Sequence, residues 1–232
     1  MSVLLLRFAA PLQAWGSSSK FDIRTTEREP TKSGVIGMIA SALGIQRNAE
    51  NADDELKKLN EMRFGVRVEK EGKLIKDFHM AYSGKLSDSK KRHTSLSKMK
   101  SDIHLSERYY LSDAVFLVAI ESDDTELLKK IESALQRPVY PLFLGRRSCP
   151  PTLPVVYGMR DSELTEILRN EPPLIQDSKN KSAMRIVYDT LSDGTVVRDC
   201  PVSFSQLHRQ YGFRMKKEEI LMPYEHDPMN EL

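Results

Sequence analysis

The sequence is poor in cysteine and in long apolar runs. Its 232 residues include two cysteines, Cys149 and Cys200, which are too few for a disulfide framework and lack the spacing of metal ligands. No apolar run approaches the ~20 residues that a membrane-spanning helix needs. There are also no internal repeats and no low-complexity segments. These absences exclude a disulfide-stabilised scaffold and a helical membrane span, and a reducing cytoplasm is the expected compartment.

Signals for secretion, metals and cofactors are missing as well. The apolar run at residues 3–9 is broken by Arg7 and lacks a basic leader and a small-residue cleavage site, so we expect a first strand and not a signal peptide. None of the five histidines lies at metal-ligand spacing from another, and the carboxylates show no paired pattern that would hold divalent ions. We therefore expect no metal and no cofactor.

Positive charge is unevenly distributed, although the net charge is only +2. Between residues 85 and 108 the acidic residues are Asp88, Asp102 and Glu107. The basic residues of the same segment are Lys85, Lys90, Lys91, Arg92, Lys98, Lys100 and Arg108. Lysine and arginine follow nucleic-acid phosphates, and the tyrosines that flank the segment can stack on unpaired bases. The segment is therefore predicted to contact nucleic acid; a solvated loop is the alternative.

Apolar periodicity predicts a mixed α+β chain. Strands are expected at 3–9, 64–68, 74–82 and 114–120, helices at 33–43, 51–59, after Asp123 or Asp124, and near 161–169, and a hairpin at 184–188 and 195–198 before an irregular tail. The basic segment 84–107 is expected to be a loop or an excursion out of the domain, and the proline-rich segment 138–151 is expected to be a loop. The order strand, helix, strand, excursion, strand, helix indicates a ferredoxin-like unit, a fold that includes the RNA recognition motif.

Two short segments have the chemistry of an anion site. The first is Gly145, Arg146, Arg147 and Ser148. It offers backbone N–H groups, two guanidiniums and a hydroxyl to a phosphate, although a solvated basic turn has the same residues. The second is Lys32 and Ser33 at a helix start, where N–H groups and a positive dipole end favour anions. A helix start that is merely capped is the alternative there, and neither segment is a Walker loop.

Several blocks along the chain resemble the CasD subunits of type I-E Cascade, members of the fifth Cas family in the RAMP superfamily. The blocks are residues 4–16 (LLLRFAAPLQAWG), 30–37 (PTKSGVIG), 43–47 (LGIQR), 108–116 (RYYLSDAVF), 144–150 (LGRRSCP) and 198–204 (RDCPVSF). They follow one another in order and span nearly the whole chain. This resemblance is therefore far more specific than any single motif.

The resemblance implies an RRM-like RAMP domain at 1–150, with a thumb inserted at about 82–110, and a small β-rich C-terminal region at 151–232. It implies a non-catalytic subunit of the Cascade surveillance complex that caps the 5′ handle of the guide CRISPR RNA (crRNA) in antiviral defence. The expected protein partners are the backbone subunit and the large subunit. Target DNA would be contacted only indirectly, and no membrane contact is expected.

The resemblance also assigns roles to the residues singled out above. The basic segment would be the thumb that kinks the RNA, with Arg108 at its base as a handle contact. Trp15 would either stack on a handle base or pack in the core. The residues expected at the RNA are Gln13, Trp15, Lys32, Ser33, Lys85, Lys90, Lys91, Arg92, Arg108, Gly145, Arg146, Arg147 and Ser148.

Two other functions stay open on the sequence alone. Type I-C relatives cleave the repeat RNA with a Tyr-Lys-His set, and Tyr82, Lys85, His79 and His104 leave a metal-independent endoribonuclease as the leading enzyme alternative. An adaptor between protein subunits that does not touch RNA is the third hypothesis.

Overall fold

The computed structural model describes residues 1–16, 22–47, 49–82, 103–175, 184–205 and 209–221. These residues form a mixed α+β structure, as expected. Its main sheet is antiparallel and runs in the order β10-β11-β9-β4-β7-β1-β8. The strands are β1 (Ser2–Ala9), β4 (Arg63–Lys70), β7 (Val115–Ser122), β8 (Val156–Arg160), β9 (Met184–Asp189), β10 (Thr195–Ser203) and β11 (Gln210–Leu221).

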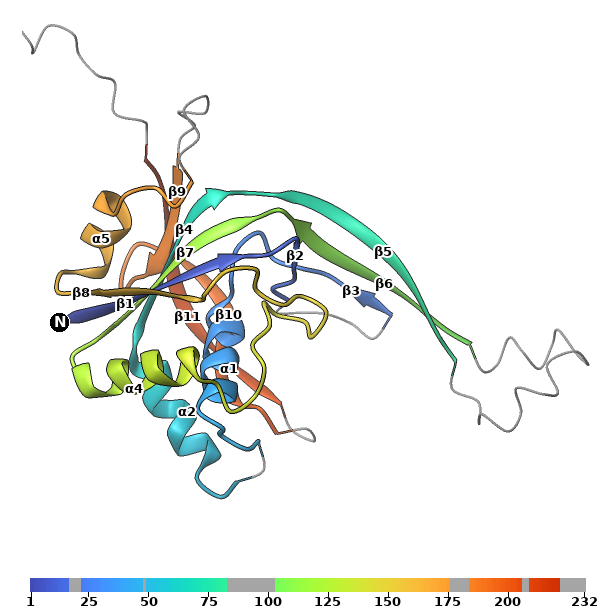
Figure 1. Ribbon diagram of the computed structural model, residues 1–232, viewed down its shortest axis with the longest axis horizontal. Helices are drawn as coiled ribbons and strands as arrows, with labels where there is room; N and C mark the ends of the chain where they lie inside the picture. Colours follow the sequence, from blue (N-terminus) through green and yellow to red (C-terminus); the bar gives the residue numbers. More distant parts are fainter. Residues whose placement is uncertain (17–21, 48, 83–102, 176–183, 206–208, 222–232) are drawn as a thin grey trace, which may run out of the picture.

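Helices cover both faces of this sheet (Figure 1). They are α1 (Lys32–Ala42), α2 (Ala52–Glu61), α4 (Thr125–Gln136) and α5 (Leu164–Asn170). Side chains of a strand alternate between the two faces. In β1, Leu4 and Leu6 therefore pack with α1, α2 and α4, while Val3 and Leu5 pack with α5. Burial on both faces explains why β1 and β7 are continuous apolar runs.

The two longest helices of the described residues, α1 and α4, begin at side chains that cap them. Thr31 accepts a hydrogen bond from the backbone N–H of Gly34 at 3.2 Å, and Asp124 accepts one from Leu127 at 2.9 Å. Each cap satisfies an N–H group that the helix itself leaves unpaired. The predicted helices at 33–43, at 51–59 and after Asp124 are confirmed as α1, α2 and α4.

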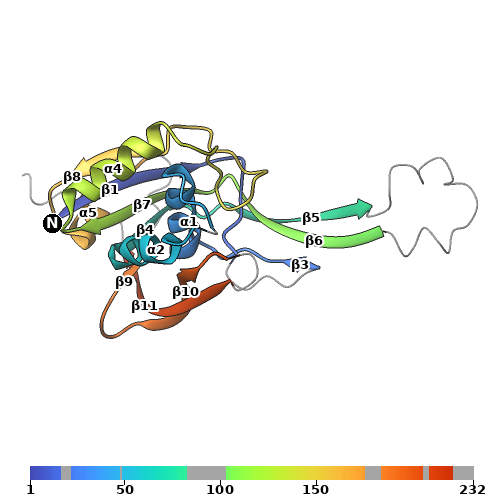
Figure 2. The same ribbon diagram turned by 90° about the horizontal axis from the view of Figure 1, so that it is seen from below.

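A second sheet extends away from the body as an arm (Figures 1 and 2). It consists of β2 (Leu12–Gln13), β3 (Ile23–Arg24), β5 (Lys73–Tyr82) and β6 (Ile103–Ser112). β5 and β6 form the arm itself, paired from Lys73 opposite Ser112 to Tyr82 opposite Ile103. The predicted strand at 74–82 is confirmed.

Of the two readings of the basic segment, loop is wrong for residues 103–107. They belong to β6, in the arm that projects from the body. Ile103 and Leu105 alternate with His104 and Ser106 over only a few residues, and it is the pairing with β5 that fixes their strand conformation. Lys85, Lys90, Lys91 and Arg92 lie outside the described residues, so their predicted RNA contacts stay predictions.

The C-terminal strands also differ from the prediction. The hairpin between 184–188 and 195–198 is wrong, because β9 pairs with β4 and β11, and β10 pairs with β11. The expected irregular tail is wrong for residues 210–221, which form β11. Charged residues hide this strand in the sequence, and ion pairs such as Lys216 with Glu29 at 2.6 Å neutralise them.

Strands from both sides of residue 150 share the main sheet. β8 pairs with β1, and β9 pairs with β4. The division of the chain at residue 150 stays a prediction. Over the described residues, no helix combines the length and the apolar character needed to cross a lipid bilayer.

Candidate nucleic-acid interface

A hollow of about 490 Å³ lies beside α1. Its floor includes the glycine face of α1, and its walls come from the 140–145 loop and from the end of β10. Its lining includes Ser33, Gly37, Arg47, Tyr140, Phe204 and Arg209. The hollow therefore combines small side chains, aromatic rings and arginines, the composition that suits an unpaired base and its phosphate.

Two glycines bring α1 close to its neighbours. A Cβ atom at Gly34 would lie 3.0 Å from the Trp15 ring, and one at Gly37 would lie 3.4 Å from the Phe204 ring. Glycine in a helix interior is unfavourable by about 1 kcal/mol relative to alanine. At Gly34 close packing against the Trp15 ring offsets that loss, and at Gly37 the helix backbone lies next to the Phe204 ring.

Arginines border the hollow from two distant parts of the chain. Arg209 is exposed, and its guanidinium carbon lies 5.3 Å from the centre of the Phe204 ring and 5.4 Å from that of Tyr211. Arg47 is exposed as well. Burial raises the pKa of the Tyr211 hydroxyl, so at neutral pH this ring stays uncharged. The border is thus a positively charged stacking surface.

Within the segment from Gly145 to Ser148, some groups pack against the body of the protein and others are exposed to solvent. Gly145 has φ of +90°, and a Cβ atom there would lie 1.7 Å from the carbonyl oxygen of Ala14. Arg146 turns inward: it donates to the carbonyl of Tyr109 at 3.0 Å and stacks 4.6 Å from the Tyr110 ring centre. Arg147 and Ser148 are exposed, and the Ser148 hydroxyl contacts the buried Tyr110 and Cys149. Of the two arginines, the exposed Arg147 is the one available to a ligand.

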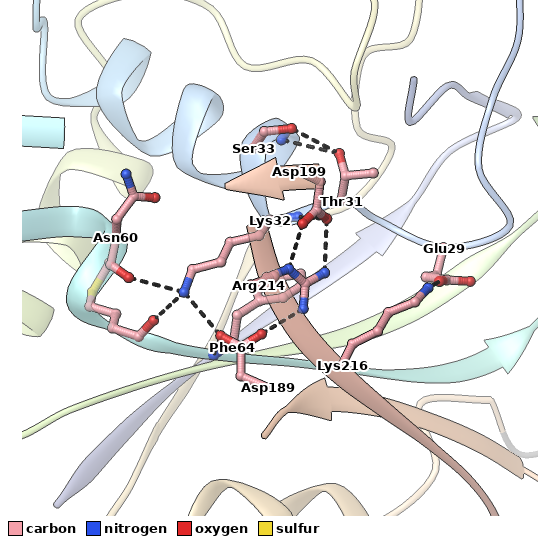
Figure 3. A network of polar contacts seen from close by, with 12 residues as sticks. Glu29, Thr31, Lys32, Ser33, Asn60, Phe64, Asp189, Asp199, Arg214 and Lys216 are labelled. Atoms are coloured by element: carbon pink, nitrogen blue, oxygen red, sulfur yellow. Dashed lines mark hydrogen bonds and ion pairs between the residues drawn. The ribbon is translucent and has the colours of Figure 1, made fainter. Parts of the chain in front are cut away.

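Lys32 lies in a buried polar network and not on the surface (Figure 3). Its ammonium group donates to the carbonyls of Asn60 at 3.0 Å and Met62 at 2.8 Å, and to Asp189 at 2.9 Å. An ammonium has three donors, so all of them are used. Ser33 is buried and contacts Thr31 at 3.4 Å. The start of α1 is therefore capped by Thr31, and its lysine is bound by buried acceptors. This agrees with a helix start that is merely capped and not with an open anion site.

The same network joins α1 to the C-terminal strands. Arg214 of β11 donates to Asp189 and Asp199, each at 2.5 Å, and Asp199 accepts from the backbone N–H of Lys32 at 3.1 Å. Burial alone would lower the pKa of Arg214, but the two carboxylates raise it. Through these contacts β10 and β11 are held against α1, which fixes Phe204 and Arg209 at the hollow.

Gln13 and Trp15 are buried under the loop that carries Arg146. The Gln13 amide donates to the carbonyl of Ala114 at 2.7 Å and accepts from the Trp15 indole at 3.1 Å. Trp15 stacks on Phe8 with ring centres 5.4 Å apart, and it is 1% exposed. Of the two roles weighed for Trp15, packing is the one seen.

Arg108 lies on the polar face of the arm. It stands opposite Asp77 in β5 and beside Arg24 in β3. Its side chain is half-buried, and its Nε is a buried atom for which no partner occurs among the described residues. Neighbouring positions on the same face hold His79 and, on the opposite strand, His104.

Three arginines near this surface were not singled out in the sequence as RNA contacts: Arg24, Arg47 and Arg209. Arg47 and Arg209 are far apart in the chain, and only the docking of β10 and β11 on α1 brings them to one hollow. The only signal in the local sequence for an RNA contact was the position of Arg209 between two aromatic residues, Phe204 and Tyr211. The Lys32 network likewise gave no sequence signal, because its partners come from the end of α2 and from three strands.

Comparisons with known proteins agree on one family. A family model described as "CRISPR-associated protein (Cas_Cas5)" matches residues 3–215. The CRISPR system Cascade subunit CasD of Escherichia coli is 35% identical over 184 residues, which is 75% of this chain and 78% of that protein. A chain of a CRISPR RNA-guided surveillance complex is 31% identical, with a TM-score of 0.77 over 96% of this chain and 91% of its own. The crystal structure of a Cas protein is 32% identical, with a TM-score of 0.71 over 95% of each chain. The chain belongs to the CRISPR-associated Cas5 family.

Proposed function

We propose that this protein is a non-catalytic, crRNA-binding subunit of a Cascade-type surveillance complex and that it holds the 5′ handle of the guide RNA. The observation that carries the proposal is the hollow beside α1, where the exposed Arg47 and Arg209 border aromatic rings. The likeness to a Cascade subunit supports the assignment of the ligand as guide RNA.

The proposed RNA surface runs from the arm to the hollow. Arg24 and Arg108 begin it, Arg147 and Ser148 continue it, and Arg47 and Arg209 end it. Arg146 links the arm to the hollow: it donates to the carbonyl of Arg24 at 2.7 Å, and the adjacent Gly145 lines the hollow. In this proposal Gln13, Trp15, Lys32, Ser33 and Arg146 hold the surface in place and do not contact RNA directly.

We further infer a ferredoxin-like unit at the centre of the fold. Its support is the strand order β4-β7-β1-β8, with α1 and α2 after β1 and α4 after β7. The β5–β6 arm is the insertion in this unit, and the strands after residue 160 are the added C-terminal region. The backbone and large subunits of the complex are the proposed neighbours, in the cytoplasm.

The test is RNA binding by the purified chain at several salt concentrations. Arg47→Ala and Arg209→Ala each remove a charge-assisted contact, so each is expected to weaken the affinity for CRISPR repeat RNA about tenfold. The slope of log affinity against log salt should become shallower by about 0.7 for each lost phosphate contact. The matched control is Lys130→Ala on α4, whose side chain lines a hollow rich in acidic residues.

The same incubation, in a metal chelator, separates the three hypotheses. Intact RNA bound through its 5′ handle agrees with the proposal. Cleavage at one repeat position would establish the metal-independent endoribonuclease instead. If the folded chain binds no RNA, the RNA-free adaptor is favoured. If the wild type and both arginine variants bind RNA equally well, the hollow beside α1 is not the RNA surface.

A further inference from the structure

The last two strands of the main sheet continue past their neighbour β9 as a two-stranded ribbon. We define this C-terminal ribbon as residues 196–204 and 209–215. β11 pairs with β9 only from Lys216 onward, so up to Met215 its sole strand partner among the described residues is β10. The ribbon lies along α1 and α2 (Figure 2), and it carries Phe204 and Arg209 to the hollow. One wall of the proposed RNA site therefore belongs to an element that extends beyond the rest of the sheet.

Little apolar burial holds the C-terminal ribbon in place. Among the described residues of the two apolar cores, Phe204 is the only one that comes from the ribbon, and it is only partly buried. Val196, Val202 and Phe213 are instead 60%, 48% and 70% exposed. A two-stranded ribbon is marginally stable without further packing, and segments with few buried apolar contacts open at a lower free energy than the core. The ribbon is therefore expected to be the wall of the hollow that opens.

Polar contacts of Asp199 hold the ribbon on α1 instead. Its side chain is buried, and both carboxylate oxygens accept hydrogen bonds (Figure 3). One oxygen accepts from Nε of Arg214 at 2.5 Å, and the other accepts from Nη2 of Arg214 at 2.8 Å and from the backbone N–H of Lys32 at 3.1 Å. The carboxylate thus joins both strands of the ribbon to the first turn of α1, where the helix dipole also favours a negative charge. Asn60 of α2 adds a second link by donating to the Pro201 carbonyl.

We propose that Asp199 is a positioning residue for RNA binding, and that the C-terminal ribbon is a clasp which opens and closes over the bound RNA. The inference rests on the proposed function, because it takes the hollow as an RNA site. RNA contacts both walls when the ribbon is closed and only α1 and the 140–145 loop when it is open. RNA therefore binds the closed form more tightly and shifts the ribbon toward it. Asp199 does not touch RNA; it raises the fraction of molecules in which the ribbon is closed, and the apparent affinity rises with that fraction.

The first measurement is backbone hydrogen exchange of the folded chain without RNA, read by mass spectrometry of its peptides. The amides of the ribbon strands are expected to exchange about tenfold or more faster than those of β4 and β7, because local opening exposes the ribbon while the central strands await global unfolding. Addition of repeat RNA should slow exchange in the ribbon. A ribbon that exchanges as slowly as β4 and β7 would overturn the clasp.

Variants of the two links test what keeps the ribbon closed. Asp199→Asn keeps the size of the side chain but replaces charge-assisted hydrogen bonds by neutral ones, so exchange in the ribbon should rise about tenfold while β4 and β7 stay as in the wild type. Asn60→Ala removes the second link and should act in the same direction. The matched control is Asp193→Asn, whose 87% exposed side chain pairs with Lys217; its ribbon should exchange within about twofold of the wild type. Faster exchange throughout the Asp199 variant would show a merely structural role and overturn the proposal.

The second measurement is the dissociation rate of repeat RNA from the same proteins. Asp199→Asn is expected to raise this rate about tenfold and to leave the salt dependence of the affinity unchanged, since no phosphate contact is lost. A wild-type dissociation rate in a variant whose ribbon exchanges faster would overturn the role of the clasp in RNA binding. Failure of the wild-type chain to bind RNA would refute the proposed function, and the clasp's role in RNA binding with it. The exchange experiment without RNA would still decide whether Asp199 holds the ribbon closed.

Discussion

Single cations inside this protein hold the chain together. Arg67 is fully buried, pairs with Glu69 at 2.6 Å and donates to the carbonyls of Leu168 at 3.2 Å and Pro172 at 2.9 Å. It thereby ties the end of α5 to β4. Lys32 does the same for α1, Asp189 and the end of α2. A buried charge of this kind is tolerated only because every donor finds an acceptor.

Replacing Lys32 by methionine tests that role at the residue scale. Lys32→Met leaves the Asp189 carboxylate without this ammonium and two carbonyls without a donor, so the free energy of unfolding should fall by about 3–5 kcal/mol. Urea denaturation measures the change. Lys58→Met is the control: Lys58 is 65% exposed beside Glu55, and such pairs contribute about 0.3–0.5 kcal/mol. Equal, small losses in both variants would contradict a stabilising network.

At the scale of elements, the loop between α4 and β8 depends on one backbone conformation. Gly145 holds φ at +90° with its Cα facing the carbonyl oxygen of Ala14. This close approach lets Arg146 reach Tyr110 while Arg147 stays outside. The loop has no regular structure, so its shape depends on that contact and on the bond from the Ala14 N–H to the Leu144 carbonyl at 3.2 Å.

Gly145→Ala is therefore expected to displace the loop. The added methyl would lie 1.7 Å from the Ala14 oxygen, so the backbone must move, and the positive φ alone is unfavourable for alanine by about 1–2 kcal/mol. Thermal unfolding should show a lower melting temperature, and RNA affinity should fall with it because Arg147 moves. Gly212→Ala is the control, since its Cβ would meet only ordinary contacts from 3.4 Å. A Gly145 variant as stable as this control would refute the assigned contact.

At the scale of the whole molecule, ion pairs join the N-terminal half to the last strands. Glu29 pairs with Lys216 of β11 at 2.6 Å and with Arg185 of β9 at 3.0 Å. Burial alone would raise the pKa of Glu29, but these two cations lower it below its ordinary value of 4.5. A carboxylate with a lowered pKa contributes stability above its unfolded value, and that stability is lost as the pH falls through the folded value.

Acid unfolding should therefore depend on Glu29. We expect the wild type to lose stability as the pH drops below 4.5, the ordinary pKa of this group. Glu29→Gln should be less stable at pH 7 and should show a shallower loss on acidification. The measurement is the free energy of unfolding at pH 7, 5, 4 and 3. Glu126→Gln, an 83% exposed glutamate on α4, is the control; parallel curves for wild type and Glu29→Gln would contradict the linkage.

The sequence by itself determined the features that depend on neighbours along the chain. Apolar alternation and end signals marked the helices α1, α2 and α4 and the strands β1, β4, β5 and β7, because side-chain period and capping are local properties. The blocks shared with the CasD subunits identified the family for the same reason. The glycine-arginine loop was also visible, as a set of groups suited to phosphate.

Only the tertiary structure decided which cations are buried and which face outward. Lys32 and Arg146 are cations in the sequence like Arg47 and Arg209, yet the first two are consumed by partners from other elements and the last two border one hollow. β11 was hidden because its charges are neutralised by Glu29, Asp189 and Asp199, which lie elsewhere in the chain. Pairing between distant strands and ion pairs across them depends on long-range contacts, and local periodicity carries no information about those.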